Sequence, residues 1–335
     1  MGETAVVLDL LERIDGIVSV VGSMNADYTV TAERLPNPGE TITGGPLRIL
    51  PGGKSGNQAA AAARIGADAR MFGAVGSDGN ADFLLGELHK AGVDTTHVRH
   101  VPGASGTTVI TVDARGENTI VYSPGSNAQV DVDYIDASRD AITASNVLGL
   151  CLESPIAAVT EAARIGHETG VTVLLNNSPF MATLPDELIA NTDILLVNEH
   201  EMVQMFDIDE PDNGDWSGFD WTLAWERMRA CGFDRAIVTL GGDGSVVLDA
   251  TVAASGLAAS PIPPITRIAP VRVDAVDTTG CGDAFMGTVL AGLASGFALR
   301  EAAQLASYVS AYAATGYGAQ ASYGTTAQIR TRFGV

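Results

Sequence analysis

Two aspartates, Asp277 and Asp283, enclose the turn Thr-Thr-Gly-Cys-Gly directly ahead of an apolar run. A helix that begins near Asp283 would present first-turn N–H groups that have no partner inside the helix and carry positive partial charge. Gly280 and Gly282 allow these amides to converge on one anion. The Asp283 carboxylate could then accept the proton of a hydroxyl that attacks a phosphoryl group. This division of labour favours phosphoryl transfer, which needs positioning, charge stabilisation and a base.

A second polar pair, Asn25 and Asp27, follows the apolar stretch 17–21. Residues two apart in an extended chain face the same way. A carboxylate beside an amide suits recognition of vicinal hydroxyls, because the carboxylate accepts hydrogen bonds and the amide both donates and accepts them. Asn and Asp are also common turn residues, and the spacing by itself favours a turn.

The segment Pro51–Gly56, PGGKSG, resembles the end of a phosphate-binding P-loop. The first glycine of that motif would fall at position 48, which is arginine, so the motif fails. The Gly-Gly pair could still bring backbone close to a small ligand, with Lys54 and Asn57 supplying polar contacts. A plain strand-to-helix loop fits the segment equally well.

Three later apolar strands also end in polar residues, at Glu153, at Asn198 and over Thr239–Gly244. A carboxylate at a helix start, a helix cap and a hairpin turn are the ordinary explanations. The glycine-rich exit could instead be a place where backbone amides meet phosphate.

Strands that alternate with helices, most regularly after residue 134, predict an α/β fold with a doubly wound, mostly parallel sheet flanked by helices. Such folds bind ligands at strand ends, where these polar residues lie. Strands at about 27–51 and 107–123 interrupt the alternation and indicate a small β-sheet lid.

The composition limits the partners and the compartment. The chain has 335 residues and a net charge of −21, which argues against nucleic-acid or anionic-membrane partners but not against a local anion site. Its only lysines are Lys54 and Lys90, and its three cysteines form no CxxC, which favours a reducing compartment. The N-terminus lacks the basic region of a signal peptide, and no apolar run is long enough to cross a membrane. We therefore expect a soluble cytoplasmic protein.

Taken together, these motifs resemble the ribokinase-like (PfkB) family of carbohydrate kinases. The resemblance rests on GGKSGNQAAAAARIGA, GAVGSDGNADFLLGELHKAGVDT and above all DTTGCGDAF, with GSMNAD, LESP, VNEHE and TLGGDG at fitting spacing. It implies a kinase domain over 17–333 after an N-terminal extension, 1–16. The implied activity is ATP-dependent phosphorylation of the 5-hydroxyl of D-ribose, with Mg²⁺ required and K⁺ as an activating cation.

The resemblance also implies roles for individual residues. Asp283 would be the base, in contact with the sugar, and the amides of Gly280, Cys281 and Gly282 would form an anion hole. The implied sugar-binding residues are Asn25, Asp27, Gly53, Lys54, Asn57 and Glu153. The implied nucleotide-binding residues are Asn198, Thr239, Leu240, Gly241, Gly242, Asp243, Gly244 and Gly282.

Two cation sites follow from the same resemblance. Glu201 would organise Mg²⁺ through water. The implied K⁺ ligands are the Asp277 carboxylate, the Ser322 hydroxyl and the carbonyls of Thr279, Ala313, Gly316 and Gly318. Cys281 stands where the family usually has alanine, and we expect it to contribute only its N–H.

Several points stay open at this stage. The acidic segment 207–220 is most simply a solvated loop, and a pocket for the nucleotide base, expected around Ser307, has no clear motif. A kinase for another sugar or a nucleoside is the main alternative, although Tyr28, Ile110 and Val112 of the lid form no obvious aromatic cage.

A sugar-binding protein without catalysis is a second alternative, which the retained Asp283 disfavours. A dinucleotide enzyme is disfavoured because Phe285 stands where G-x-G-x-x-G needs its third glycine. Because exposed sheet edges are usually paired or covered, and family members dimerise through the lid, we expect a homodimer.

Overall fold

The computed structural model describes residues 2–251 and 265–335, and within these residues the larger sheet has nine strands. Their order is β13-β12-β11-β10-β9-β8-β1-β4-β5. Their bounds are β1 Ile17–Val21, β4 Asp68–Val75, β5 Val98–His100, β8 Val147–Leu150, β9 Thr172–Asn176, β10 Ile194–Asn198, β11 Arg235–Thr239, β12 Ser245–Asp249 and β13 Ile265–Ile268. Neighbours from β11 to β5 pair in parallel, and β12 and β13 add antiparallel. The predicted mostly parallel sheet is confirmed.

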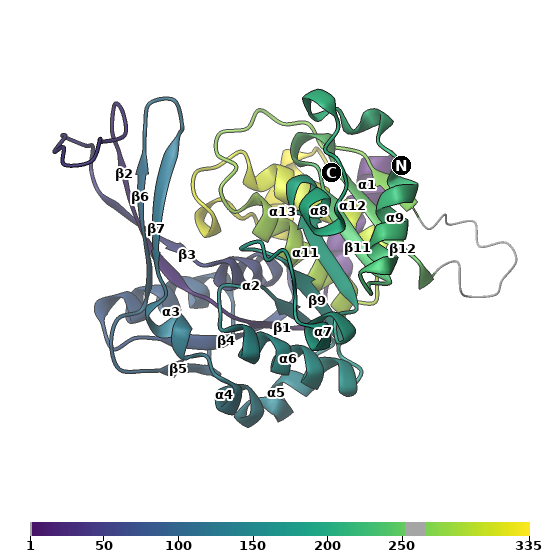
Figure 1. The fold of residues 1–335 in the computed structure, drawn as a ribbon, viewed down its shortest axis with the longest axis horizontal. Coiled ribbons are helices and arrows are strands. Elements are labelled where there is room, and N and C mark those ends of the chain that lie inside the picture. The colour runs from purple at the N-terminus through teal and green to yellow at the C-terminus, as the bar shows by residue number, and fades with distance from the viewer. Residues whose placement is uncertain (1, 252–264) are drawn as a thin grey trace, which may run out of the picture.

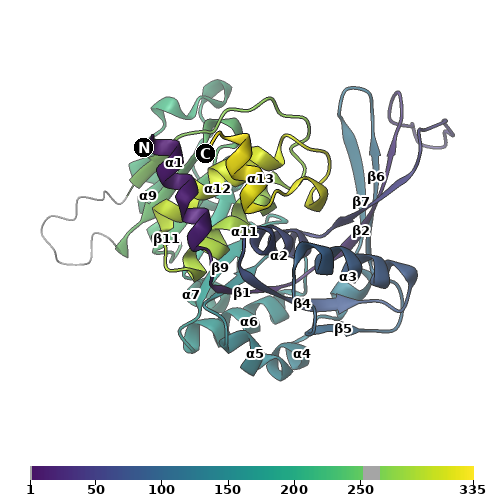
Figure 2. The same ribbon diagram turned by 180° about the vertical axis from the view of Figure 1, so that it is seen from behind.

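Helices cover both faces of this sheet (Figures 1 and 2). The α-helices are α1 Glu3–Leu8, α2 Lys54–Arg64, α3 Gly79–Ala91, α4 Val132–Ala137, α5 Arg139–Thr143, α6 Ile156–Glu168, α7 Asp186–Ala190, α8 Glu199–Phe206, α9 Trp221–Ala230, α11 Cys281–Ala294, α12 Leu299–Ala313 and α13 Thr326–Arg332. The short 3₁₀ helices are η1 Asp9–Arg13, η2 Gly125–Gln129, η3 Asp212–Gly214, η4 Trp216–Gly218, η5 Gly241–Asp243 and η6 Gln320–Ser322. One apolar core packs α1, α2, α3, α11 and α12 on one face, and a second packs α4, α6, α8 and α9 on the other. None of the helices in the described ranges is both long and apolar enough to cross a membrane.

The strand order reverses between β1 and β8, which pair in parallel. From β1 the chain moves outward to β4 and β5, and from β8 it moves outward in the other direction to β9, β10 and β11. Such a reversal opens a crevice beyond the carboxyl ends of the two central strands. The segments that follow Val21 and Leu150 therefore border one ligand site.

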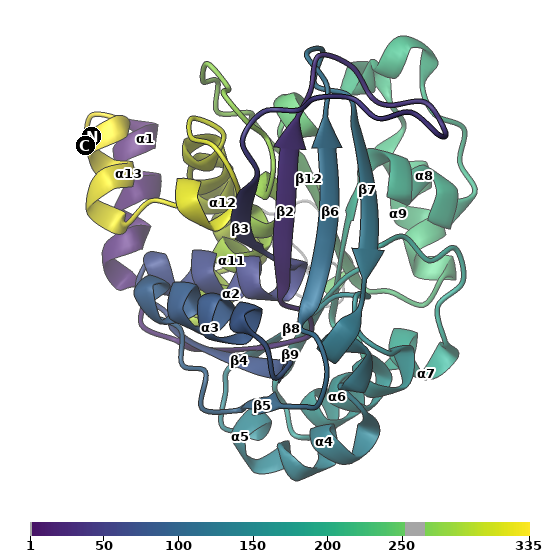
Figure 3. The ribbon, with the colours of Figure 1, turned by 90° about the vertical axis from the view of Figure 1, so that its left-hand side faces the viewer.

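The smaller sheet stands out from the main body beside this crevice (Figures 1 and 3). It contains β2 Asn25–Thr31, β3 Arg48–Gly52, β6 Gly106–Val112 and β7 Asn118–Ser123 in the order β3-β2-β6-β7. It is the smaller sheet that the sequence predicted. Strand β2 begins at Asn25, just after β1, and β3 ends at Gly52, just before α2. The start of β2 and the end of β3 therefore both lie at the crevice.

Strand register gives the lid two different faces. Residues paired across neighbouring strands point to the same side, and the next residues along point to the other side. One row, which we call the inner row, consists of Leu50, Asp27, Thr108 and Tyr122. The adjacent row, the outer row, consists of Ile49, Tyr28, Val109 and Val121.

The N-terminal segment packs on the main body beside α12 and α13 (Figure 2). Leu8 and Leu11 are buried in the core, the Arg330 guanidinium donates to the Leu8 carbonyl at 3.1 Å, and the Tyr308 hydroxyl lies 3.1 Å from that of Thr4. The sequence offered no role for residues 1–16. For residues 3–13, the structure provides a packing role.

The acidic segment 207–220 is not simply a solvated loop, so that expectation was incomplete. Its carboxylates face solvent, but Trp216 is only 4% exposed and packs with Phe219 and with Trp221 of α9. Burial of large aromatic side chains anchors the segment to the second core.

Candidate active site

The carboxyl ends of β1, β8, β9, β10 and β11 converge on the N-termini of α2 and α11. A cavity of about 190 Å³ lies at this point. It is lined by Lys54, Asn176, Ser178, Leu196, Val197, Asn198, Glu201, Thr239, Gly280, Gly282 and Asp283. The topology thus gathers residues that are more than 200 positions apart in the chain.

Asp283 is buried in the first turn of α11, and amides from α2 fix its carboxylate. The Asn57 amide donates to Oδ2 at 2.9 Å and the Gln58 amide donates to Oδ1 at 3.2 Å. Burial raises the pKa of Asp283 to about 6, against the opposing effects of Lys54 and of these two amides. The result is an oriented carboxylate that can accept a proton near neutral pH. Helix α11 itself begins at Cys281, two residues before the predicted start.

Lys54, at the start of α2, is the cation of this site. Burial opposes its charge, but the carboxylates of Asp283 and Glu153, with Glu201 further away, outweigh burial and raise the pKa of the ammonium group. The ammonium group and the carboxylates around it therefore favour each other's charged forms. Gly53 precedes Lys54 with a φ of +87°, and a Cβ there would lie 2.7 Å from the Cα of Met24. Only glycine suits that conformation and that approach.

Glu153 follows β8 and Asn25 begins β2 just after β1, so the two come from the two sides of the switch point, where hydrogen bonds hold them. Glu153 accepts hydrogen bonds from the Ser23 hydroxyl and, at 2.9 Å, from the Lys54 N–H. Asn25 is 2% exposed, and its Oδ1 accepts from the amide of Asn127 at 2.7 Å. These contacts orient two polar side chains at the mouth of the lid.

Asp27 belongs to the inner row of the lid and accepts a hydrogen bond from the Thr108 hydroxyl across the strand pair. Burial raises its pKa to about 6, and the charges of Glu153 and Asp283 add to that increase. Gly52 lies directly against the Asp27 carboxylate, where a Cβ would collide with it. The structure brings the proposed sugar-binding residues, Asn25, Asp27, Gly53, Lys54, Asn57 and Glu153, into one region. Gly53 lies against the Asn25 backbone, Asn57 contacts Asp283, and the charges of Glu153 and Asp283 act on Asp27.

The residues of the predicted anion hole, Gly280, Cys281 and Gly282, span the start of α11, and one of them is an exception to that prediction. Gly280 has a φ of +75°, and a Cβ there would lie 2.5 Å from the Cβ of Ala319 and 2.7 Å from the Tyr323 hydroxyl. Gly282 faces open space, with nothing within 4 Å of a Cβ. The exception is Cys281, whose N–H donates to the Thr278 carbonyl at 3.2 Å. Burial raises the pKa of its thiol to about 11, as expected for a side chain that does no chemistry.

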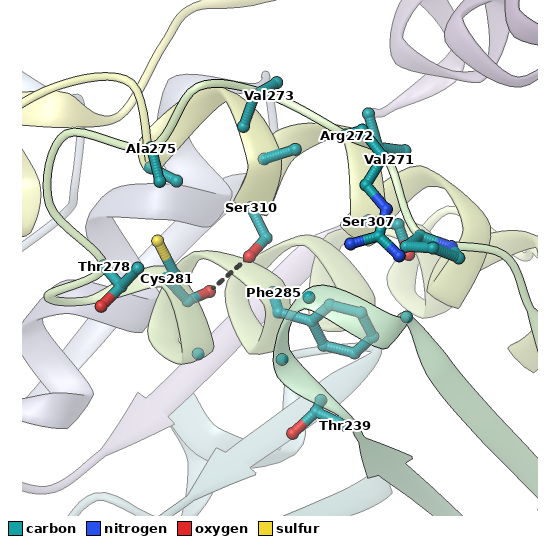
Figure 4. A pocket seen from close by; sticks show the side chains of 17 residues that line it. Thr239, Val271, Arg272, Val273, Ala275, Thr278, Cys281, Phe285, Ser307 and Ser310 are labelled. Atoms are coloured by element: carbon teal, nitrogen blue, oxygen red, sulfur yellow. Dashed lines mark hydrogen bonds between the residues drawn. The ribbon is translucent and has the colours of Figure 1, made fainter. Parts of the chain in front are cut away.

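A second cavity, of about 380 Å³, lies on the other side of Gly282 (Figure 4). The glycine-rich exit of β11 forms one wall through Thr239, Gly241, Gly242 and Gly244, as the sequence led us to expect for a nucleotide. The other lining residues are Pro270, Val271, Arg272, Val273, Ala275, Thr278, Cys281, Phe285, Ser307, Ser310, Ala311 and Ala314. The helix around Ser307 does line the space.

Three proposed nucleotide residues lie elsewhere. The Leu240 side chain is buried in the second core, and the Asp243 carboxylate faces solvent and lies 3.4 Å from the Arg272 guanidinium. Asn198 lines the smaller cavity. Thr239 and Gly282 border both cavities, so a nucleotide in the larger one could extend its phosphates toward Asp283.

Asn198 and Glu201 form a capping box at the start of α8. The Asn198 side chain accepts from the Glu201 N–H, and the Glu201 carboxylate accepts from the Asn198 N–H, each at 2.8 Å. Burial raises the pKa of Glu201. No cluster of three or more His, Cys, Asp or Glu side chains that could hold a metal ion occurs within residues 2–251 and 265–335. A divalent cation here would depend on water and on the phosphates of a ligand.

Asp277 ties its own turn to the loop after α12. Its carboxylate accepts from the N–H of Thr279 and from that of Gly318, both at 2.9 Å. These bonds lower the pKa of Asp277 even though burial acts to raise it, so the group is ionised. Ser322 lies close to Gly316 in the same loop. The proposed cation ligands Asp277, Thr279, Ala313, Gly316, Gly318 and Ser322 thus come from two segments that this carboxylate holds together.

Several residues of the site carried no signal in the sequence. Gln58 and Gln320 extend the amide network, the latter by donating to the Asn57 Oδ1 at 3.0 Å. Asn127 of η2 donates to Asn25 and to the Tyr122 hydroxyl, which itself donates to the Glu153 carbonyl. Arg272 is the one charged side chain among the described residues that line the larger cavity. The sequence analysis found site residues by looking for polar residues at strand ends. It missed these residues because they lie on helices, in loops and on a lid strand.

Comparison with known proteins decides the family. The sequence pattern described as pfkB family carbohydrate kinase matches residues 17–326. The chain belongs to the PfkB family of carbohydrate kinases. It is 32% identical over 309 residues to the ribokinase of Haemophilus influenzae, covering 92% of this chain and 95% of that one. It is 33% identical over 317 residues to the ribokinase of Schizosaccharomyces pombe, covering 91% and 94%.

Two further matches bear on this PfkB kinase. A deoxyribokinase from Salmonella typhi is 29% identical over 311 residues, covering 91% of this chain and 95% of that one. The structure of Arabidopsis thaliana ribokinase complexed with ribose and ATP superposes with a TM-score of 0.83 at 26% identity, covering 95% of this chain and 98% of that one. The chain is thus an enzyme of the kinase class with the fold of ribokinases.

Proposed function

We propose that this kinase transfers the γ-phosphoryl group of ATP to the 5-hydroxyl of D-ribose. The observation that carries the proposal is the position of Asp283. Its fixed carboxylate lines the smaller cavity beside Lys54 at the N-terminus of α11, and its charge reaches Asp27 in the lid. A sugar hydroxyl and a phosphoryl group could therefore meet at one carboxylate, and the ribokinases of similar sequence support ribose as the sugar.

The residues suggest how the step proceeds. Asp283 accepts the proton of the sugar hydroxyl, whose oxygen forms a bond to the γ-phosphorus as the bond from that phosphorus to the bridging oxygen of ADP breaks. The Gly282 N–H and the positive end of α11 stabilise the negative charge on the transferring group. Lys54 offsets the charge of the surrounding carboxylates. Asp27, Asn57 and Glu153 hold the other hydroxyls.

Two cations fit residues of this chain. Mg²⁺ bound to the ATP phosphates would lie near Glu201, held through water, and would supply charge neutralisation. The ionised Asp277, the Ser322 hydroxyl and nearby carbonyls offer an all-oxygen set, which suits K⁺. That set would steady the turn that carries Gly280 and Gly282.

Two wider features belong to the same proposal. The outer row of the lid exposes Ile49, Val109 and Val121 by 44%, 53% and 67%, and we infer that a second copy covers these side chains in a homodimer.

The three cysteines are unpaired, which supports a location in the reducing cytoplasm.

A coupled ADP-release assay tests the proposal with ribose, 2-deoxyribose, fructose, adenosine and inosine, each with and without K⁺. We expect ribose to give the highest kcat/KM and K⁺ to raise it. Preference for 2-deoxyribose would favour the activity of the deoxyribokinase relative, and preference for a nucleoside would contradict the sugar assignment.

Asp283→Asn tests the base. Loss of a general base should lower kcat by about 10²–10⁴-fold, with ribose binding largely kept. Calorimetric measurement of ribose binding to the variant distinguishes a loss of the chemical step from a loss of ribose binding. A variant with close to the original kcat would show that the proton goes elsewhere.

A further inference from the structure

Tyr122 lies at one end of the inner row of the lid. Strand pairing aligns Leu50 with Asp27, Asp27 with Thr108, and Thr108 with Tyr122, so their side chains point to the same side of the sheet. The Asp27 carboxylate, near the middle of this row, marks the side that faces the proposed sugar site. Tyr122, which is 37% exposed, therefore projects from the same face as Asp27 and from the face opposite to the outer row.

Two hydrogen bonds fix the Tyr122 ring against the main body. Its hydroxyl donates to the backbone carbonyl of Glu153 at 3.2 Å and accepts from the Asn127 amide at 3.4 Å. The same amide donates to the Asn25 Oδ1 at 2.7 Å. The ring thus bridges the lid and the strand end that carries Glu153, and it shares a hydrogen-bond network with a proposed sugar ligand.

The other end of the row is also closed. A Cβ built on Gly318 would lie 3.5 Å from Leu50 Cδ1, so Leu50 leans on the loop after α12. Four neighbouring strands at about 4.7–4.9 Å spacing place Leu50 and Tyr122 roughly 14 Å apart between backbones. Leu50 and Tyr122 thus stand at the two ends of the row that carries Asp27.

We propose that Tyr122 determines substrate class by closing the sugar site against a base attached to the sugar. This inference rests on the proposed function and adds the residue that selects a free furanose over a nucleoside. A nucleoside carries a planar base on the same ring, and with Tyr122 bonded to Glu153 the base has no space on that side. The hydroxyl bonds matter because they hold the ring in the blocking position.

The test compares kcat/KM for ribose and for inosine in three variants. Tyr122→Ala opens the edge and should raise the inosine-to-ribose ratio at least about tenfold, because it removes a steric exclusion. Tyr122→Phe keeps the ring but loses both hydrogen bonds, and should give a smaller increase. Tyr28→Phe is the matched control: its hydroxyl donates to the Asn80 Oδ1 at 2.9 Å from the outer row, and the ratio should not change.

A binding readout supports the kinetic one. Inosine should not compete with ribose in the unaltered kinase and should compete in Tyr122→Ala. If Tyr122→Ala unfolds, Tyr122→Leu serves, since it keeps an apolar side chain but shortens it. A fall in the ratio would show that the ring is a platform for a base, and an unchanged ratio would show that it only fastens the lid; either result overturns the inference. Failure of the proposed function appears separately, as a lack of ribose activity in the unaltered kinase.

Discussion

Asp27 and Asp283 are two buried carboxyl groups at one site, and both have a pKa raised to about 6. Burial is the main cause in each. The charges of Glu153 and Asp283 add to the increase at Asp27, and Lys54 opposes the increase at Asp283. Carboxyl groups that serve only structure are more often stabilised in their charged form. Raised pKa values in a polar cleft are instead typical of residues that handle protons or hydroxyls.

The pH dependence of activity should follow from Asp283. Below about pH 6 its carboxyl binds a proton and can no longer accept one, so kcat/KM for ribose should fall as pH is lowered through 6. Because Lys54 lowers the pKa of Asp283, Lys54→Met should move this fall to higher pH. Profiles from pH 4.5 to 8.5 for both proteins test this. An acid limb near pH 4, or one that Lys54→Met does not move, would contradict it.

Stability should improve when the charge of Asp27 is removed. Its pKa in the folded chain, about 6, lies above the ordinary value of 3.8, so charge on this carboxyl costs stability above pH 6. Asp27→Asn keeps an oxygen for the Thr108 hydroxyl and should raise the free energy of unfolding at pH 8 by roughly 1–3 kcal/mol. The gain should shrink as pH falls from 6 toward 4, because the folded protein then binds the proton. Denaturant unfolding at pH 8 and pH 4.5 measures both, and equal gains at the two pH values would refute the account.

At the scale of elements, the site depends on how α2 and α11 meet. A Cβ on Gly287 of α11 would lie 2.8 Å from the Ala61 Cβ, so the two helices touch closely. This contact brings Asn57 and Gln58 to the Asp283 carboxylate. Two glycines lie at the start of α11, Gly280 directly before the helix and Gly282 in its first turn, and their surroundings differ.

Gly280→Ala and Gly282→Ala should therefore have different effects. Gly280 has a positive φ and touches Ala319, so alanine there should lower the free energy of unfolding by roughly 1–3 kcal/mol. Gly282 has free space, so alanine should leave stability nearly unchanged, but its methyl group would occupy the phosphate path and raise the KM for ATP severalfold. Thermal unfolding and ATP kinetics on both variants measure this. Equal effects of the two substitutions on stability would contradict the assignment.

At the scale of the whole molecule, the lid is a thin sheet with a different task on each face. Its inner row carries Asp27 toward the main body. Its outer row leaves three aliphatic side chains exposed. Such an exposed aliphatic row needs a cover, and a second copy of the chain would supply it.

Association in solution should therefore depend on the outer row. Light scattering after gel filtration should give twice the mass of the chain, and Val121→Lys should give the single mass, because a charge there would be buried without a partner. Asp9→Lys, on the far N-terminal segment, is the control and should leave the dimer intact. A monomer in the unaltered protein would refute the proposed dimer.

Much of this protein is determined by its sequence alone. The alternation of apolar segments specifies a parallel sheet, since buried strands and amphipathic helices can pack in few other ways. Polar residues at strand ends predicted Asn25, Glu153 and Asn198 as site residues, and the turn before Asp283 predicted an anion site, because these signals are local. Their roles stay predictions.

Only the tertiary structure decided which residues from distant segments contact those predicted site residues. Asn57 and Gln58 reach Asp283 across more than 220 residues, Arg272 faces a cavity from a loop, and strand register places Tyr122 on the same face of the lid as Asp27. A one-residue shift of register would turn Tyr122 to the opposite face without any change in composition. Such contacts depend on packing between distant segments, which no local pattern encodes.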